Sequence, residues 1–299
     1  MIKILVVDRS SSTDWYGACE QTLTTIYTLC EYPEQYTELL LTELHKKLKS
    51  ESNQSVIARF IFTLAHSSLK LLIHLDSLEA KLKKLKQEAD KHNSNKNEEE
   101  LDKVMGGIEG EFERRIERLQ SLADAIPEDP FVAKWLRIIE YIVKNTESGS
   151  ELERIAVLSF CKFMCISEKY CRDHMSTLFS TLSRPNMDAI IKNNIIISMG
   201  DLLHRFPNLV EPHSRFLYQN LHDQNPNVRK TTMIVLTHLI LNDMIKVKGE
   251  MCNIAILFED SSLELQNLAH IFFNEINKKE PKFIYNMLPE MITKLSSPD

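Results

Sequence analysis

The sequence predicts an all-α protein, an α-solenoid of stacked helix pairs that carries one charged insertion. Matching apolar runs begin at Ile191, Val228 and Leu265, 37 residues apart each time (228 − 191 and 265 − 228), and a looser copy begins at Leu152. Within each run the apolar residues follow the period of an α-helix, and self-similarity at about 40 residues with that period is typical of helix-pair solenoids. Only 7 Gly and 10 Pro occur in 299 residues, which disfavours a sheet-rich or loop-rich fold.

Residues 1–75 are predicted to form the first domain, which consists of solenoid helices. The segment Trp15–Leu29 places its apolar residues on one face, and the helix-breaking Pro33 follows it. A second amphipathic helix is expected at about 35–48, and a third enters the apolar run Val56–Leu64. The third helix is expected to continue to Lys86, where lysines replace the apolar stripe.

Residues 76–128 are predicted to form an insertion, which consists of an extended charged helix, a disordered excursion and a return helix. The segment Lys91–Glu100 has almost nothing to bury and is predicted to be a mobile loop. The Gly106–Gly107 pair lies in polar sequence with no strand before it, which indicates a flexible linker. The return helix is placed at Glu111–Leu122, before the break at Pro127–Pro130.

Residues 129–299 are predicted to form the regular repeats. The expected helix pairs are 131–145 with 150–166, 168–183 with 187–204, 210–222 with 226–242, and 249–259 with 262–277. A last helix at about 281–296 has no predicted partner, so its apolar side chains are expected to remain uncovered.

A second signal repeats in the turn within each helix pair. Asn186, Asp223 and Asp260 are also 37 residues apart (223 − 186 and 260 − 223), and each precedes a long polar side chain by six residues. These later side chains belong to Lys192, Arg229 and Gln266. A carboxylate or amide in such a turn can cap the second helix and accept a hydrogen bond from the adjacent repeat. We therefore predict a structural ladder, and not an acid with a phosphate-binding group, because catalytic residues do not recur in spaced copies.

The six-residue spacing from Asp to Arg, with Pro226 and Val228 between, is typical of HEAT repeats, so an ARM/HEAT superhelix is expected. Longer runs closely resemble the condensin complex subunit 1 family, the HEAT-repeat non-SMC regulatory subunits of condensin. The matching runs are Asn194–Leu202, Arg205–Pro212, Val228–Gly249, Phe272–Glu275, Ile284–Pro289 and Leu295–Asp299, with weaker matches at 19–27, 58–62 and 98–112. Nearly the whole chain takes part, most strongly residues 151–299, and it resembles an internal, later segment of the longer family proteins.

The resemblance implies a non-catalytic scaffold that binds the kleisin and SMC subunits of condensin and supports mitotic chromosome condensation. It also implies a location in the nucleus and on chromosomes, with the cytoplasm as an interphase location, and no cofactor or small-molecule substrate. A generic HEAT-repeat adaptor of the nuclear-transport or phosphatase-scaffold type is the alternative. Such an adaptor would share the 37-residue ladder but would lack the run Thr237–Gly249.

The charge pattern limits any contact with nucleic acid. The net charge of −6 is inconsistent with a strongly basic protein. Lys230, Lys246 and Lys248 lie outside the predicted ladder, so weak, sequence-independent contact with DNA or chromatin phosphates is one function for them, and a solvated face is the other. No stretch approaches the ~18 uncharged apolar residues of a membrane span, so no membrane contact is expected.

The six cysteines follow no disulfide-framework spacing and are interpreted as free thiols. Cys161, Cys165, Cys171 and His174 have the residue types of a zinc site. However, Cys161 and Cys165 lie one turn apart in an apolar helical stripe. We therefore predict that they are core residues and that the protein holds no metal.

Overall fold

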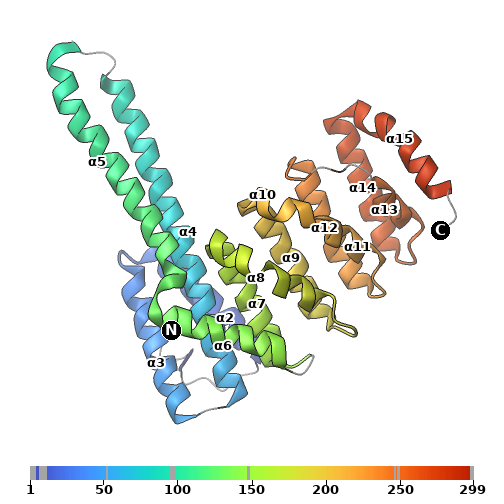
Figure 1. Cartoon of the computed structure of the whole chain (residues 1–299), viewed down its shortest axis with the longest axis horizontal. Helices are drawn as coiled ribbons and strands as arrows, with labels where there is room; N and C mark the ends of the chain where they lie inside the picture. The colour runs from blue at the N-terminus through green and yellow to red at the C-terminus, as the bar shows by residue number, and fades with distance from the viewer. Residues whose placement is uncertain are drawn as a thin grey trace. The chain divides into compact units, whose positions relative to one another are not determined.

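A computed structural model describes residues 5–6, 12–51, 53–93, 98–146, 149–245, 247 and 250–296 of the chain (Figure 1). In these ranges the regular structure consists of α-helices and short 3-10 helices, without a strand. The predicted all-α class is therefore confirmed. The chain divides into two compact units: the first comprises Met1–Thr146 and Ser150–Cys171, and the second comprises Glu147–Gly149 and Arg172–Asp299. The predicted division at residues 75 and 128 stays a prediction.

The first unit is built around one long helix. It contains α2 (Ser12–Leu29), α3 (Pro33–Ser50), α4 (Gln54–Asn93), α5 (Glu98–Ala125), η1 (Ile126–Glu128), α6 (Pro130–Asn145) and α7 (Glu151–Ile166). Helix α4 packs against α2, α3, α5 and α7. Residues 60–68 of α4 are all buried, because other helices surround this part of it. Trp15 is fully buried beside them, and its indole Nε1 donates to the carbonyl oxygen of Leu5 (2.9 Å).

Helix α4 is apolar enough over Gln54–Glu88 to cross a membrane by length and composition, with a mean hydropathy of 1.6 in its most apolar window. No such stretch was expected from the sequence. However, 72 % of that window is buried within the protein. Burial of this kind is typical of a core helix, and the packing of α4 against four other helices explains its composition.

The second half of α4 and the returning α5 lie side by side (Figure 1). Lys86 Nζ lies 2.9 Å from Glu113 Oε1, and Gln120 Nε2 donates to Glu79 Oε1 (2.9 Å). The return helix is longer than the expected 111–122, and it includes the Gly106–Gly107 pair, so the expected linker is wrong. A glycine costs a helix only about 1 kcal/mol, and the surrounding Glu- and Leu-rich sequence favours helix. Of the expected loop at 91–100, residues 91–93 and 98–100 are instead helical, in α4 and α5, and residues 94–97 lie outside the described residues.

The second unit contains the regular repeats. Its principal helices are the last part of α8 (Glu168–Leu182), α9 (Ala189–Arg205), α12 (Pro226–Leu241), α14 (Leu263–Lys279) and α15 (Pro281–Ser296). Helix α12 packs against both α9 and α14. The first residue of each apolar run is buried, since Ile191, Val228 and Leu265 are 0 %, 0 % and 1 % exposed. Residues 37 positions apart therefore occupy the same core position in three successive repeats.

The first helices of the later pairs are shorter than expected. Instead of one helix at 210–222, the structure has α10 (Pro207–Val210), η2 (Glu211–His213), α11 (Arg215–Gln219) and η3 (Asn220–His222). Pro212 lacks the N–H group that a continuous helix requires. The next pair begins similarly with α13 (Met251–Ala255) and η4 (Ile256–Glu259).

Candidate functional site

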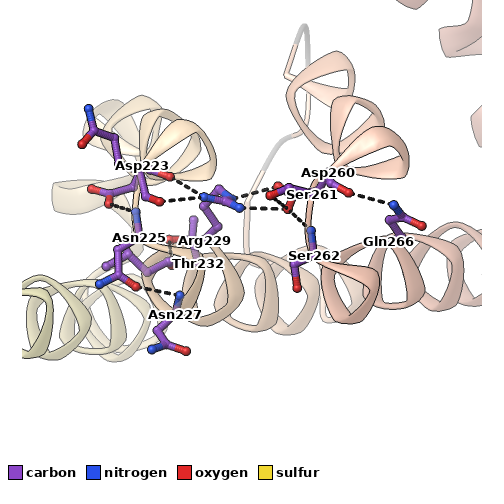
Figure 2. A network of polar contacts seen from close by, with 11 residues as sticks. Asp223, Asn225, Asn227, Arg229, Thr232, Asp260, Ser261, Ser262 and Gln266 are labelled. Atoms are coloured by element: carbon purple, nitrogen blue, oxygen red, sulfur yellow. Dashed lines mark hydrogen bonds and ion pairs between the residues drawn. The ribbon is translucent and has the colours of Figure 1, made fainter.

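The turn before α14 contains a bidentate ion pair between successive repeats. Arg229, in the first turn of α12, donates from Nε to Asp260 Oδ2 (2.8 Å) and from Nη2 to Asp260 Oδ1 (2.8 Å) (Figure 2). The two side chains are only 12 % and 9 % exposed. Because both partners are shielded from water and the geometry is parallel, this contact holds α12 firmly to the turn of the next repeat.

The same guanidinium also binds its own turn. Arg229 Nη1 donates to the backbone carbonyls of Asp223 (2.8 Å) and Gln224 (3.1 Å). Gln266 repeats this contact one repeat later, where Nε2 donates to the carbonyl of Asp260 (2.7 Å) (Figure 2). The six-residue spacing thus brings Arg229 and Gln266 onto the backbone of their own turns, while the carboxylates of Asp223 and Asp260 bind the preceding repeat.

The contact between the preceding pair of repeats uses a lysine. Lys192 Nζ lies 2.5 Å from Asp223 Oδ2, and the side chains are 23 % and 12 % exposed. An ammonium group makes a point contact, whereas the guanidinium of Arg229 makes two parallel hydrogen bonds. We expect this contact to be the weaker of the two.

The second helix of a repeat pair is capped by a residue other than the predicted turn residue. Asp188 and Asn225 are the N-caps of α9 and α12, and their side chains accept from backbone N–H groups of the first turn at 3.0 and 2.9 Å. Asp223 instead accepts from the backbone N–H of Asn225 (2.8 Å) and so fixes the cap residue. Asn186 has φ 56°, a left-handed conformation that Asn tolerates well. Its place in the ladder stays a prediction.

The electrostatics of Asp260 agree with its geometry. Burial alone would raise the pKa of its carboxyl group, but hydrogen bonds from Arg229 and from the backbone N–H of Ser262 outweigh burial and lower the pKa below its ordinary value. The Ser262 bond is 2.8 Å long. The ionised carboxylate is therefore the form that the folded protein favours at neutral pH.

Three exposed isoleucines occupy equivalent positions on α9, α12 and α14. Ile197, Ile234 and Ile271 are again 37 residues apart (234 − 197 and 271 − 234). They are 48 %, 49 % and 55 % exposed. Because α12 packs against both other helices, the three side chains lie on successive neighbouring helices. We call these three residues the isoleucine row.

The ladder and the isoleucine row share one register, because each row isoleucine follows a ladder side chain by five residues. Ile234, for example, follows Arg229. The ladder bonds fix successive second helices relative to one another, so they also keep the isoleucines aligned. The row was not predicted, although the three isoleucines occupy the same position in the repeats. Helical periodicity alone does not show which isoleucines of an apolar run are exposed, and only the exposed fractions distinguish them.

Of the three lysines considered for DNA contact, the structure describes one. Lys230 forms an ion pair with Glu264, and their side chains are 39 % and 61 % exposed. Lys246 and Lys248 lie outside the described residues. A DNA contact by these three lysines stays a prediction, and the Glu264 carboxylate partly neutralises the one that the structure describes.

The cysteines considered for a zinc site are in the protein core. Cys161 and Cys165 are buried in α7, and Cys171 is buried in α8. No group of three or more His, Cys, Asp or Glu residues is placed to hold a metal ion in the described part of the chain.

A buried polar pair joins α4 to α7 in the first unit. Lys162 Nζ lies 2.9 Å from His66 Nδ1 and 4.5 Å from the centroid of the Phe62 ring. Burial lowers the pKa of Lys162 to about 8. Burial and the neighbouring ammonium group of Lys162 lower the pKa of His66 to about 3. At pH 7 the imidazole of His66 is therefore neutral, whereas Lys162 is easier to deprotonate than an ordinary lysine but still mostly carries its proton.

Comparison with known proteins gives one consistent family. Residues 190–299 match the family model of the non-SMC mitotic condensation complex subunit 1. Condensin complex subunit 1 of Xenopus laevis is 33 % identical over 97 % of this chain and 23 % of its own length. A condensin-1 complex subunit of Arabidopsis thaliana is 30 % identical over 93 % of this chain and 21 % of its own length. The human condensin complex subunit 1 is 41 % identical over 51 % of this chain and 11 % of its own length. The chain thus spans about a quarter or less of these relatives.

Proposed function

Because the chain belongs to the family of condensin complex subunit 1, we propose that it is a non-catalytic scaffold segment of a condensin complex that binds kleisin and SMC subunits. In this role it supports mitotic chromosome condensation in the nucleus, while ATP hydrolysis belongs to the SMC subunits. The isoleucine row is the observation that carries the binding role. A repeated, half-exposed aliphatic side chain on a rigid helix layer is typical of a surface that another protein covers.

The spacing of the row favours a particular conformation of the bound segment. Packed helices are about 8–10 Å apart, so neighbouring isoleucines are separated by about that distance. A polyproline II segment repeats its side-chain direction every third residue and rises about 3.1 Å per residue, which gives roughly 9 Å. A β-strand repeats its direction every second residue, at about 6.6 Å, which is too short. The segment that fits is extended, with an apolar side chain at every third position.

Polar residues beside the row suit the backbone of such a segment. Four residues before each row isoleucine, and so one helical turn away on the same helix face, stand Asn193, Lys230 and Asn267. Their amide and ammonium groups are hydrogen-bond donors. An extended segment has unpaired backbone C=O groups, and these donors can satisfy them at the edge of the apolar contact.

The binding role is tested by titrating the complete subunit with the kleisin chain. Ile234→Ser should raise the Kd about five- to tenfold, because the half-exposed side chain loses the burial that the complex provides. Ile256→Ser is the matched control, since Ile256 is 46 % exposed in the same unit but lies on η4, outside the row. Equal effects of the two substitutions would remove the row from the interface.

Complex membership is tested separately by recovering the partners of a tagged subunit. We expect kleisin and SMC chains. Recovery of transport cargo or a phosphatase in their place would favour the generic adaptor.

A further inference from the structure

A cavity of about 580 Å³ opens in the first unit between α3, α4 and the start of α6. Aliphatic side chains from α3 and α4 and the exposed ring of Phe131 form much of its wall. Leu41, Leu64 and Leu71 are among these aliphatic residues. Cavities of about 300–1,000 Å³ with apolar walls are the usual size of ligand-binding sites. The space is sufficient for one or two large side chains of another molecule.

The charged groups that line this cavity are acidic. Glu34 and Glu38 lie one turn apart on α3 and are exposed. The carboxylate of Asp129 caps α6, where it accepts from the backbone N–H groups of Phe131 (2.9 Å) and Val132 (3.1 Å), so its position at the cavity edge is fixed. No lysine or arginine lines the cavity among the described residues.

His45 adds an aromatic surface to the cavity without adding a positive charge. Burial lowers the pKa of its imidazole, and Lys49 and Lys134 act in the same direction, so the ring is neutral at pH 7. The imidazole centroid lies 5.7 Å from the ring of Phe60 and 5.7 Å from that of Phe131. The cavity therefore combines an apolar, aromatic interior with a negatively charged edge.

We propose that this cavity binds a short linear segment of a partner protein, with a bulky apolar side chain inside it and an adjacent Lys or Arg facing Glu34 and Glu38. Burial of the apolar side chain supplies the main driving force. The carboxylates select a basic neighbour through charge-assisted hydrogen bonds. Because the two glutamates stand at the exposed mouth, they meet the chain that flanks the buried side chain. This site lies in the first unit and is independent of the isoleucine row.

The proposal is tested with a phage-displayed library of random 12-residue peptides selected on the full chain. We expect enriched peptides to carry an aromatic or large aliphatic residue next to Lys or Arg. Labelled copies of these peptides should lose binding at least about tenfold to Thr42→Trp, because Thr42 is an exposed lining residue and the indole fills the mouth. Leu39→Trp is the control, since Leu39 is exposed on the same helix but does not line the cavity.

A second pair of variants tests the charges. Glu34→Lys with Glu38→Lys should weaken binding about tenfold and reduce its salt dependence. Glu31→Lys with Glu51→Lys is the control and should do neither, because it changes the net charge equally at exposed positions that do not line the cavity. Circular dichroism confirms that each variant retains its helices. Enriched peptides that ignore Thr42→Trp, or that lack basic residues and ignore the reversal at Glu34 and Glu38, would overturn the proposal. A selection without enrichment would overturn it as well.

Discussion

The two units give their buried basic groups different partners. In the second unit the guanidinium of Arg229 stays charged and meets a carboxylate that the next repeat supplies. In the first unit the ammonium group of Lys162 meets an imidazole and a phenyl ring, and its pKa is lowered to about 8. A repeat brings equivalent positions together in successive copies, so a basic side chain of one repeat can meet a carboxylate of the next. In the core of the first unit burial instead lowers the pKa of the base, although Lys162 still mostly carries its proton at pH 7.

The largest expected effect comes from breaking the bidentate pair. Asp260→Ala should destabilise the protein by about 3 kcal/mol, because it leaves the shielded guanidinium of Arg229 without its carboxylate. Glu275→Ala removes an exposed pair with Lys278 and should change the stability by no more than about 0.5 kcal/mol. Urea denaturation of both variants measures the difference. Equal losses would mean that the shielding of the Arg229 pair contributes nothing.

Acid should destabilise the first unit more than the second. The folded pKa of His66 is about 3, below its ordinary 6.5, so its contribution to stability is complete above pH 6.5 and is lost as the pH falls. Between pH 6.5 and 5 the loss is at most about 2 kcal/mol. Asp260, whose pKa is lowered from 3.8, loses its contribution only in stronger acid. Hydrogen exchange at pH 7 and 5 should therefore show greater opening of the first unit.

Two histidine variants test the origin of this acid sensitivity. His66→Gln should flatten the pH profile of the first unit, while His238→Gln, at an exposed position of α12, should leave it unchanged. Equal loss of protection in both units would contradict the assignment to His66.

The lysine contact should be weaker than the arginine contact. Asp223→Ala is expected to cost about 1 kcal/mol, because it releases the Asn225 cap residue and one partly exposed ammonium group. Partner binding should persist where the fold survives. Thermal unfolding and co-purification measure the two properties. A variant that folds normally but loses all association would show that the interpretation as a structural ladder is wrong.

The smallest effect is expected at the lysines outside the ladder. Charge reversal of Lys230, Lys246 and Lys248 should lower any DNA affinity and reduce the salt slope by up to about one per lost phosphate contact. The effect is expected to be small because Lys230 already pairs with Glu264. Titration at two salt concentrations measures it, and an unchanged slope would remove these residues from consideration.

Repetition explains what could be predicted from the sequence. Helix α12 was expected at 226–242 and lies at Pro226–Leu241, because three copies of the pattern define its register. The spacing of Asp223, Arg229 and Asp260 was read in the same way, and the structure shows that Arg229 binds the carbonyl of its own turn and the carboxylate of the next. The ladder as a whole stays a prediction. Local sequence cannot reveal the contact between His66 and Lys162, because 96 residues separate them and only packing of α4 on α7 joins them. The cavity beside His45 is likewise a product of three packed helices.

The unequal contacts of the ladder have a mechanical consequence. Each contact joins one repeat to the next, so a force applied along the stack loads the contacts in series, and the weakest yields first. The single ammonium contact between Lys192 and Asp223 should open before the doubly bonded pair of Arg229 and Asp260. Under tension, the second unit is therefore expected to bend first between α9 and α12, while α12 and α14 move together as one stiff body.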